Sequence, residues 1–69
     1  MAKITVDARG LSCPQPVLLT MQALKKGAEE YEILVDNATA KNNVIRNVEH
    51  AGKKVTVRED GEDIILTVR

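Results

Sequence analysis

The chain has few of the residues that carry most protein chemistry. Of its 69 residues one is cysteine, one is histidine and one is tyrosine, and tryptophan and phenylalanine are absent. A lone cysteine cannot form an internal disulfide, so we expect a reducing, cytoplasmic compartment. One cysteine and one histidine far apart in sequence do not make a zinc site, and we expect neither a metal nor a cofactor. The aromatic surfaces on which nucleic-acid bases stack are also missing.

The balanced charge argues against a nucleic-acid-binding protein, and the lack of long hydrophobic runs argues against a membrane protein. Ten Lys and Arg residues balance ten Asp and Glu residues, and the pI of about 6.6 argues against a nucleic-acid binder, which needs a basic patch. There is no run of about 18 apolar residues and no signal-peptide segment, so we expect no membrane association. A chain of this length has room for one domain with a stability of a few kcal/mol.

The hydrophobic periodicity predicts six elements in the order β-α-β-α-β-β. Apolar alternation rich in β-branched residues predicts the strands, and apolar steps of three and four predict the helices. Gly27 and Gly52 end the two helices, and Asp36 or Asn37 caps the second one. The expected strands are 3–7, 31–36, 53–59 and 64–68. The expected helix stripes are Val17, Leu18, Met21, Leu24 and Ala28, and Val44, Ile45, Val48 and Ala51.

These elements predict an α/β fold, a two-layer α+β sandwich in which two helices cover one face of a mixed four-stranded sheet. A right-handed crossover makes the first two strands parallel, and the unbroken apolar centre of the second strand places it inside the sheet. Asp60-Gly61 predicts the turn of a final antiparallel hairpin. The outer sheet face is polar except for Leu34 and Ile65, which are either a partner surface or scattered surface residues.

Chemistry is concentrated in one segment, Cys13-Pro14-Gln15-Pro16, where the first loop meets the first helix. Proline is favoured in the first helical turn, where backbone N–H groups have no partner within the helix. We therefore expect Pro14 at the first helical position and Cys13 in the cap position. The N–H groups of Gln15 and Val17 are the expected donors near its sulfur.

A thiolate at a helix N-terminus is stabilised by the helix dipole, which lowers the pKa of the Cys13 thiol and makes it a better nucleophile. Arg9 lowers that pKa further if the loop folds back toward the sulfur. The alternative for Cys13 is an unreactive residue that only caps the helix. His50, expected near the end of the second helix, is interpreted as a solvated side chain in preference to the base of a Cys–His pair.

The string from Asp7 to Pro16, Asp-Ala-Arg-Gly-Leu-Ser-Cys-Pro-Gln-Pro, resembles the signature of the TusA/SirA/YedF family of sulfur-carrier proteins. The resemblance implies a sulfurtransferase-like carrier in which Cys13 holds sulfane sulfur as a persulfide. It implies a cysteine desulfurase or rhodanese-type donor and a DsrE-like protein acceptor, without direct contact to nucleic acid. The supporting residues that it suggests are Asp7, Arg9, Gly10, Pro14, Gln15 and Pro16.

The second half of the chain departs from the TusA pattern. Where that pattern reads Asp-Asp-Pro-Ala, this chain has Asp36-Asn37-Ala38-Thr39, and the following residues are more similar to the N-terminal module of YedF-type proteins. Residues 1–69 are thus expected to be a single TusA/SirA-like domain, or the N-terminal module of a longer protein. The acceptor pathway, tRNA thiolation or sulfur and selenium metabolism, stays open.

Two alternatives to the carrier remain. In the first, the chain is a non-catalytic interaction or regulatory domain, in which Ser could replace Cys13 as a helix cap. In the second, Cys13 is a redox sensor that depends on a resolving cysteine from elsewhere. Asp7 has two interpretations as well: it binds backbone N–H groups of the following loop, or it is an ordinary turn residue at the end of a strand.

Overall fold

The computed structural model describes residues 3–12 and 14–69 and contains six elements of secondary structure. They are β1 (Lys3–Asp7), α1 (Gln15–Lys26), β2 (Glu30–Val35), α2 (Ala38–His50), β3 (Val55–Asp60) and β4 (Asp63–Val68). The order confirms the prediction from periodicity. The ends of β1 are as expected, and the ends of the other strands differ from the expected ones by at most two residues, which is the usual uncertainty of such boundaries.

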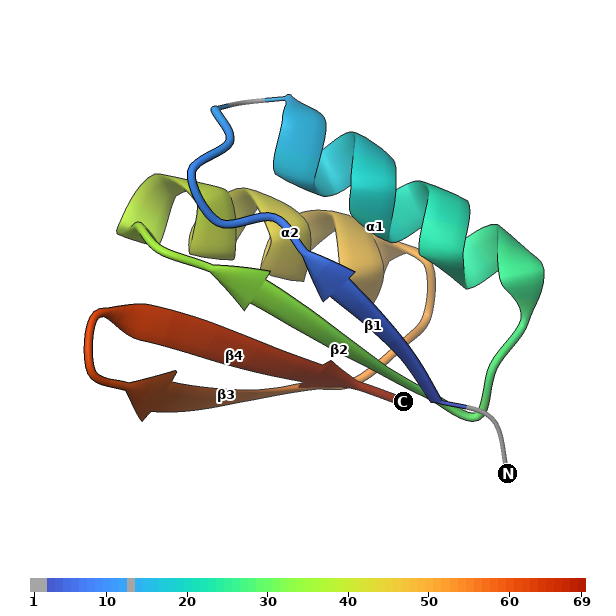
Figure 1. Cartoon of the computed structure of the whole chain (residues 1–69). Coiled ribbons are helices and arrows are strands. Elements are labelled where there is room, and N and C mark those ends of the chain that lie inside the picture. The colour runs from blue at the N-terminus through green and yellow to red at the C-terminus, as the bar shows by residue number, and fades with distance from the viewer. Residues whose placement is uncertain (1–2, 13) are drawn as a thin grey trace.

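The four strands form one mixed sheet in the order β1-β2-β4-β3. β1 and β2 are parallel, as predicted for two strands joined through α1, and β4 runs antiparallel to both of its neighbours. β2 therefore lies inside the sheet, in agreement with its apolar centre. One consequence matters for the site: the ends of β1 and β2 and the start of β4 lie at the same edge of the sheet (Figure 1).

Both helices cover the same face of the sheet (Figure 1). Alternate strand residues face them and form the core, which is completed by small and β-branched helix residues. Tyr31 is the largest core side chain and is 1% exposed. Its hydroxyl accepts the N–H of Ala28 at 2.7 Å, so the one aromatic residue also fixes the connection between α1 and β2. The principal core residues are Ala23, Tyr31, Ile33, Val35, Val44, Val48, Leu66 and Val68.

The buried face of α1 differs from the predicted one. Its buried residues are Pro16, Thr20 and Ala23, whereas Leu18 is 48% exposed. The prediction counted apolar residues only, but Thr20 is accommodated because its hydroxyl donates a hydrogen bond of 2.8 Å to the carbonyl of Pro16. The helix is rotated accordingly, and small side chains face the interior. Three members of the predicted stripe border the core: Val17, Leu24 and Ala28.

α2 follows its predicted pattern more closely. Val44 and Val48 are buried, and Asn37 is the N-cap, with its Oδ1 accepting a first-turn N–H at 2.7 Å. Asn37 is one of the two caps that were expected. Ala51, the last member of the predicted stripe, lies one position beyond the helix and is exposed.

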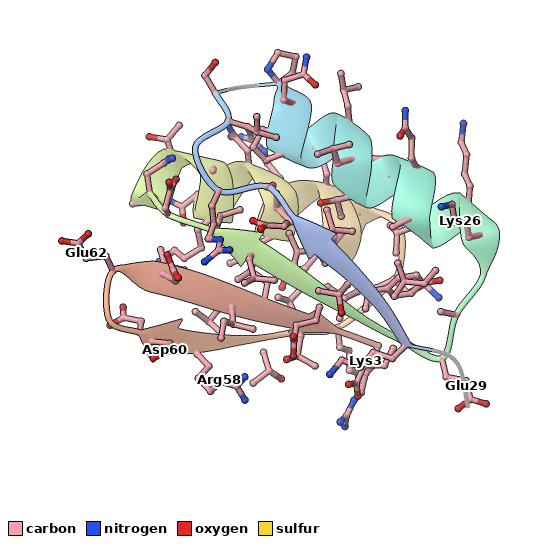
Figure 2. The ribbon with its side chains drawn as sticks, viewed as in Figure 1. Lys3, Lys26, Glu29, Arg58, Asp60 and Glu62 are labelled. Atoms are coloured by element: carbon pink, nitrogen blue, oxygen red, sulfur yellow. The ribbon has the colours of Figure 1, made fainter. Side chains whose placement is uncertain are left out.

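The outer face of the sheet carries ion pairs between side chains from different segments of the chain. Glu32 lies 3.4 Å from Lys3 and 4.0 Å from Arg58, and Glu30 lies 2.8 Å from Arg69. Figure 2 shows Lys3 and Arg58 on the periphery of the molecule. This face therefore presents paired charges of both signs.

Leu34 and Ile65, the two apolar residues predicted on that face, are direct cross-strand partners. They do not form an exposed apolar patch, because Ile65 is only 8% exposed and Leu34 is half-buried. Within residues 3–12 and 14–69 the large apolar side chains with substantial exposure lie elsewhere: Leu11, Leu18 and Val57. In the same part of the chain, neither helix is long and apolar enough to cross a membrane.

Candidate functional site

The candidate site is the loop that joins β1 to α1. Strand pairing continues one residue past β1, because the N–H of Ala8 donates to the carbonyl of Leu34 at 2.9 Å, and the Ala8 side chain is buried. The chain then turns at Gly10, whose φ of 76° is a conformation that residues with a Cβ rarely adopt. This confirms the turn expected at Gly10. The loop therefore leaves the sheet at a defined place and in a defined direction.

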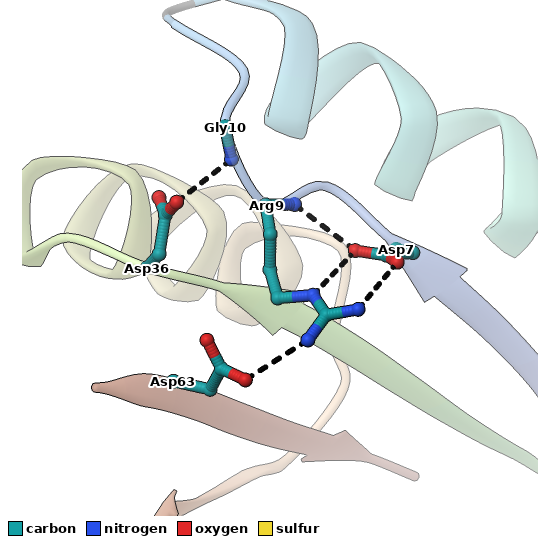
Figure 3. Close-up of polar contacts among 5 residues, drawn as sticks. All are labelled: Asp7, Arg9, Gly10, Asp36 and Asp63. Atoms are coloured by element: carbon teal, nitrogen blue, oxygen red, sulfur yellow. Dashed lines mark hydrogen bonds and ion pairs between the residues drawn. The ribbon is translucent and has the colours of Figure 1, made fainter. Parts of the chain in front are cut away.

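Arg9 anchors this loop to the outer face of the sheet (Figure 3). Its Nε and Nη2 donate to the two carboxylate oxygens of Asp7, both at 2.9 Å, and its Nη1 donates to Oδ2 of Asp63 at 2.9 Å. The backbone N–H of Arg9 also donates to Oδ1 of Asp7 at 3.2 Å. The guanidinium thus joins the end of β1 to the start of β4, a strand that is distant in sequence.

These contacts change the acidity of both partners. Hydrogen bonds from the Arg9 side chain, followed by its backbone N–H, lower the pKa of Asp7 to about 2. The same hydrogen bonds, together with those to Asp63, raise the pKa of Arg9 above its usual value. Asp7 and Arg9 are therefore both ionised throughout the physiological pH range.

The structure places the side chains of Asp7 and Arg9, both of which were expected to act in this loop. Asp7 binds the backbone N–H of the loop residue Arg9, which confirms the first of its two interpretations. Arg9 was expected to lower the pKa of the Cys13 thiol if the loop folds back toward the sulfur. Its guanidinium lies on the sheet face between two carboxylates, and because Cys13 lies outside the described residues, that expectation stays a prediction. Neutralisation by Asp7 and Asp63 makes it a poor attractor of a further anion. Its role in this structure is to anchor the loop.

A second anchor comes from the end of β2. Oδ2 of Asp36 accepts the N–H of Gly10 at 2.8 Å, and Oδ1 of the same carboxylate accepts the side-chain amide of Asn37 at 3.2 Å. Since Asn37 also caps α2, the loop is connected through Asp36 to the start of that helix. An open pocket of about 390 Å³ lies between the two segments and is lined by Gly10, Leu11, Ser12, Asp36, Asn37, Thr39 and Ala40.

The start of α1 is shifted by one residue from the prediction. Pro14 is the N-cap residue and Gln15 the first helical residue, so Pro14 is not at the first helical position and Cys13 is not the cap. The N–H of Gln15, one of the two expected donors near the sulfur, donates to the carbonyl of Ser12 at 2.9 Å. Pro16 lies in the first turn as predicted. Cys13 itself lies outside the described residues.

The charges along α1 favour an anion near its start. Its first turn contains no acidic residue, and its last turn contains Lys25 and Lys26. No carboxylate within that turn therefore competes for the positive end of the helix dipole. This distribution suits a thiolate or persulfide at the N-terminal end of the helix.

His50 is exposed at the last position of α2, as interpreted from the sequence. α2 begins beside the loop, where Asp36 binds Gly10, so His50 is about 20 Å away along a helix of 13 residues. A base at that distance does not serve a group in the loop. Within the described part of the chain there is also no group of three side chains that could hold a metal ion.

Comparison with known proteins places the chain in a family. The family model described as "Sulfurtransferase TusA" matches residues 4–69, which is nearly the whole chain. The chain belongs to the TusA family. It is also similar to the crystal structure of a SirA-like protein from Desulfitobacterium hafniense, with 32% sequence identity, a TM-score of 0.86 and coverage of 94% of this chain and 93% of that one. No curated protein matches the sequence.

Membership of the TusA family confirms the resemblance seen in the segment from Asp7 to Pro16, and with it the sulfurtransferase class and the two-layer fold. Asp36 and Asp63, which bind the loop, were not among the predicted site residues. Asp36 could have been found, because it follows a strand parallel to β1 and so ends at the same edge of the sheet. Nothing in the sequence pattern points to Asp63.

Proposed function

We propose that this TusA-family protein is a sulfur carrier in which Cys13 holds the transferred sulfur as a persulfide. The observation that carries the proposal is the Cys-Pro-x-Pro segment at the start of α1 in a chain that matches the family over residues 4–69. Cys13 is the only cysteine, so a transfer through sulfur has one candidate residue. An internal dithiol cycle is impossible for the same reason.

The transfer consists of two displacements. The thiolate of Cys13 attacks the terminal sulfur of a persulfide on the donor, a cysteine desulfurase or rhodanese-type protein; the S–S bond of the donor breaks and its thiolate leaves. In the second step a thiolate of the acceptor, a DsrE-like protein, attacks the terminal sulfur on Cys13, and the Cys13 thiolate leaves. Atoms and electrons balance without a cofactor, and the acceptor then serves tRNA thiolation or sulfur and selenium metabolism.

The surroundings of position 13 suit these steps. Pro14 and Pro16 fix the start of α1, and the helix dipole there stabilises an anionic sulfur. Leu11 and Leu18, which are 36% and 48% exposed, lie on either side of the segment in sequence. Exposed apolar side chains next to a reactive group provide contact area for a protein that delivers or receives the sulfur. We assign these two leucines to docking.

The test is intact-mass spectrometry after incubation with a cysteine desulfurase and free cysteine. The proposal predicts that the wild type gains the mass of one sulfur atom, that a reductant removes it, and that Cys13→Ser gains nothing. If neither a desulfurase nor a rhodanese-type donor loads the wild type, the carrier function is wrong. The alternative of an interaction domain is weakened by the burial of Ile65, since Leu34 and Ile65 form no exposed patch.

A further inference from the structure

Two carboxylates outside the Asp7–Pro16 segment hold the loop that leads to position 13. Oδ2 of Asp63 binds Nη1 of Arg9 at 2.9 Å, and Oδ2 of Asp36 binds the N–H of Gly10 at 2.8 Å. We propose that Asp36 and Asp63 are positioning residues for sulfur transfer, which hold the loop from Arg9 to Ser12 in place while a partner is docked. This inference rests on the proposed carrier function.

The case for these two residues depends on what they connect. Asp7 lies two positions from Arg9, so its contacts shape the loop locally but do not attach it to the rest of the domain. Asp63 and Asp36 are separated from their loop partners by 54 and 26 positions. They attach two consecutive loop residues to two other strands of the sheet. Together they attach the loop to the edge where β1, β2 and β4 meet (Figure 3).

The contacts are better suited to positioning than to global stability. Arg9 and Asp63 are both partly exposed, with side-chain exposures of 43% and 35%. Ion pairs with this exposure contribute little to the free energy of unfolding. Displacement at sulfur, in contrast, requires the attacking thiolate to meet the S–S bond in line, and small displacements of a reacting group lower rates strongly. Loss of an anchor should thus affect transfer far more than folding.

The experiment measures single-turnover transfer from a persulfide-loaded cysteine desulfurase to Cys13, at increasing donor concentration, for Asp36→Ala and Asp63→Ala. We expect the maximal transfer rate to fall about tenfold or more while the half-saturating donor concentration stays unchanged. Asp36→Asn, which keeps one acceptor oxygen for Gly10, should recover most of the rate. Glu62→Ala is the matched control, because Glu62 lies in the same β3–β4 hairpin and points away from the loop (Figure 2).

A second readout separates positioning from a merely structural role. Alkylation of Cys13 by iodoacetamide needs access but no docked partner, so both alanine variants should react as fast as the wild type. The positioning role, but not the carrier function, would be overturned if the alkylation rate fell together with the transfer rate. It would also be overturned if both variants transferred sulfur as fast as the wild type. A wild type that accepts no sulfur from the donor would overturn the carrier function, and the inference with it.

Discussion

Leu18→Gln tests whether a partner docks beside position 13. Leu18 is 48% exposed on α1, two positions after the Cys-Pro-x-Pro segment. Complete burial of a leucine side chain is worth about 1.5–3 kcal/mol, so a partner that covers the exposed half gains about 0.7–1.5 kcal/mol. This free energy corresponds to a change of about 3- to 12-fold in affinity. Glutamine is a good helix former and the site is on the surface, so the fold should be unaffected.

The assay is sulfur transfer from a persulfide-loaded cysteine desulfurase, followed by intact mass at increasing donor concentration. The half-saturating donor concentration should rise by about 3- to 12-fold, with an unchanged maximal rate. Val57→Thr is the control, since Val57 is 43% exposed on β3, the strand farthest from β1 in the sheet, and threonine keeps its shape. Equal donor dependence in both variants and the wild type would refute the assignment of Leu18 to docking.

Two further predictions concern the anchors of the fold. In Arg9→Gln the pKa of Asp7, held at about 2 by Arg9, should rise toward its ordinary value of 3.8, as NMR titration of the carboxyl carbon would show. Because folding lowers the pKa of Asp7, its contact with Arg9 stabilises the folded state fully at pH values above the pKa of Asp7 in the unfolded chain. This contribution to the free energy of unfolding is lost as the pH falls through about 2. An unchanged titration midpoint of Asp7 in the variant would contradict the structure. Tyr31→Phe leaves the N–H of Ala28 without its acceptor and should cost about 1–3 kcal/mol in urea unfolding followed by circular dichroism, whereas an unchanged midpoint would show that this contact contributes nothing.

Much of the fold could be predicted because local chemistry and tertiary structure agree in the strands and turns. The alternation from Lys3 to Asp7 predicts β1, and Gly27 ends α1 in the left-handed conformation, with φ of 72°. The buried face of α1 was predicted incorrectly. The hydroxyl of Thr20 donates a hydrogen bond to a carbonyl of its own helix, so this polar residue can be buried like an apolar one. Polarity alone does not decide burial when the partner of the polar group lies one turn away in the same helix.

The sequence allowed predictions for the parts of the site that depend on residues close together in the chain. Cys13, Pro14 and Pro16 could be proposed from the residues and the family resemblance, although the helix begins one position later than expected. The position of the Arg9 side chain could not be predicted, because it depends on which strand lies next to β2. The sequence left this open: β3 and β4 both could follow β2 in the sheet.

The strand order β1-β2-β4-β3 resolves the position of Arg9. With β1 parallel to β2 and β4 antiparallel to β2, the start of β4 lies beside the ends of the other two strands. Asp7, Asp36 and Asp63 all lie at this edge, and Arg9 emerges among them. Because two carboxylates neutralise the Arg9 guanidinium, it restrains the loop and is a poor attractor of a further anion. The sheet order therefore determines where the Arg9 guanidinium lies, and it brings Asp36 and Asp63, which are outside the Asp7–Pro16 segment, into contact with the loop before α1.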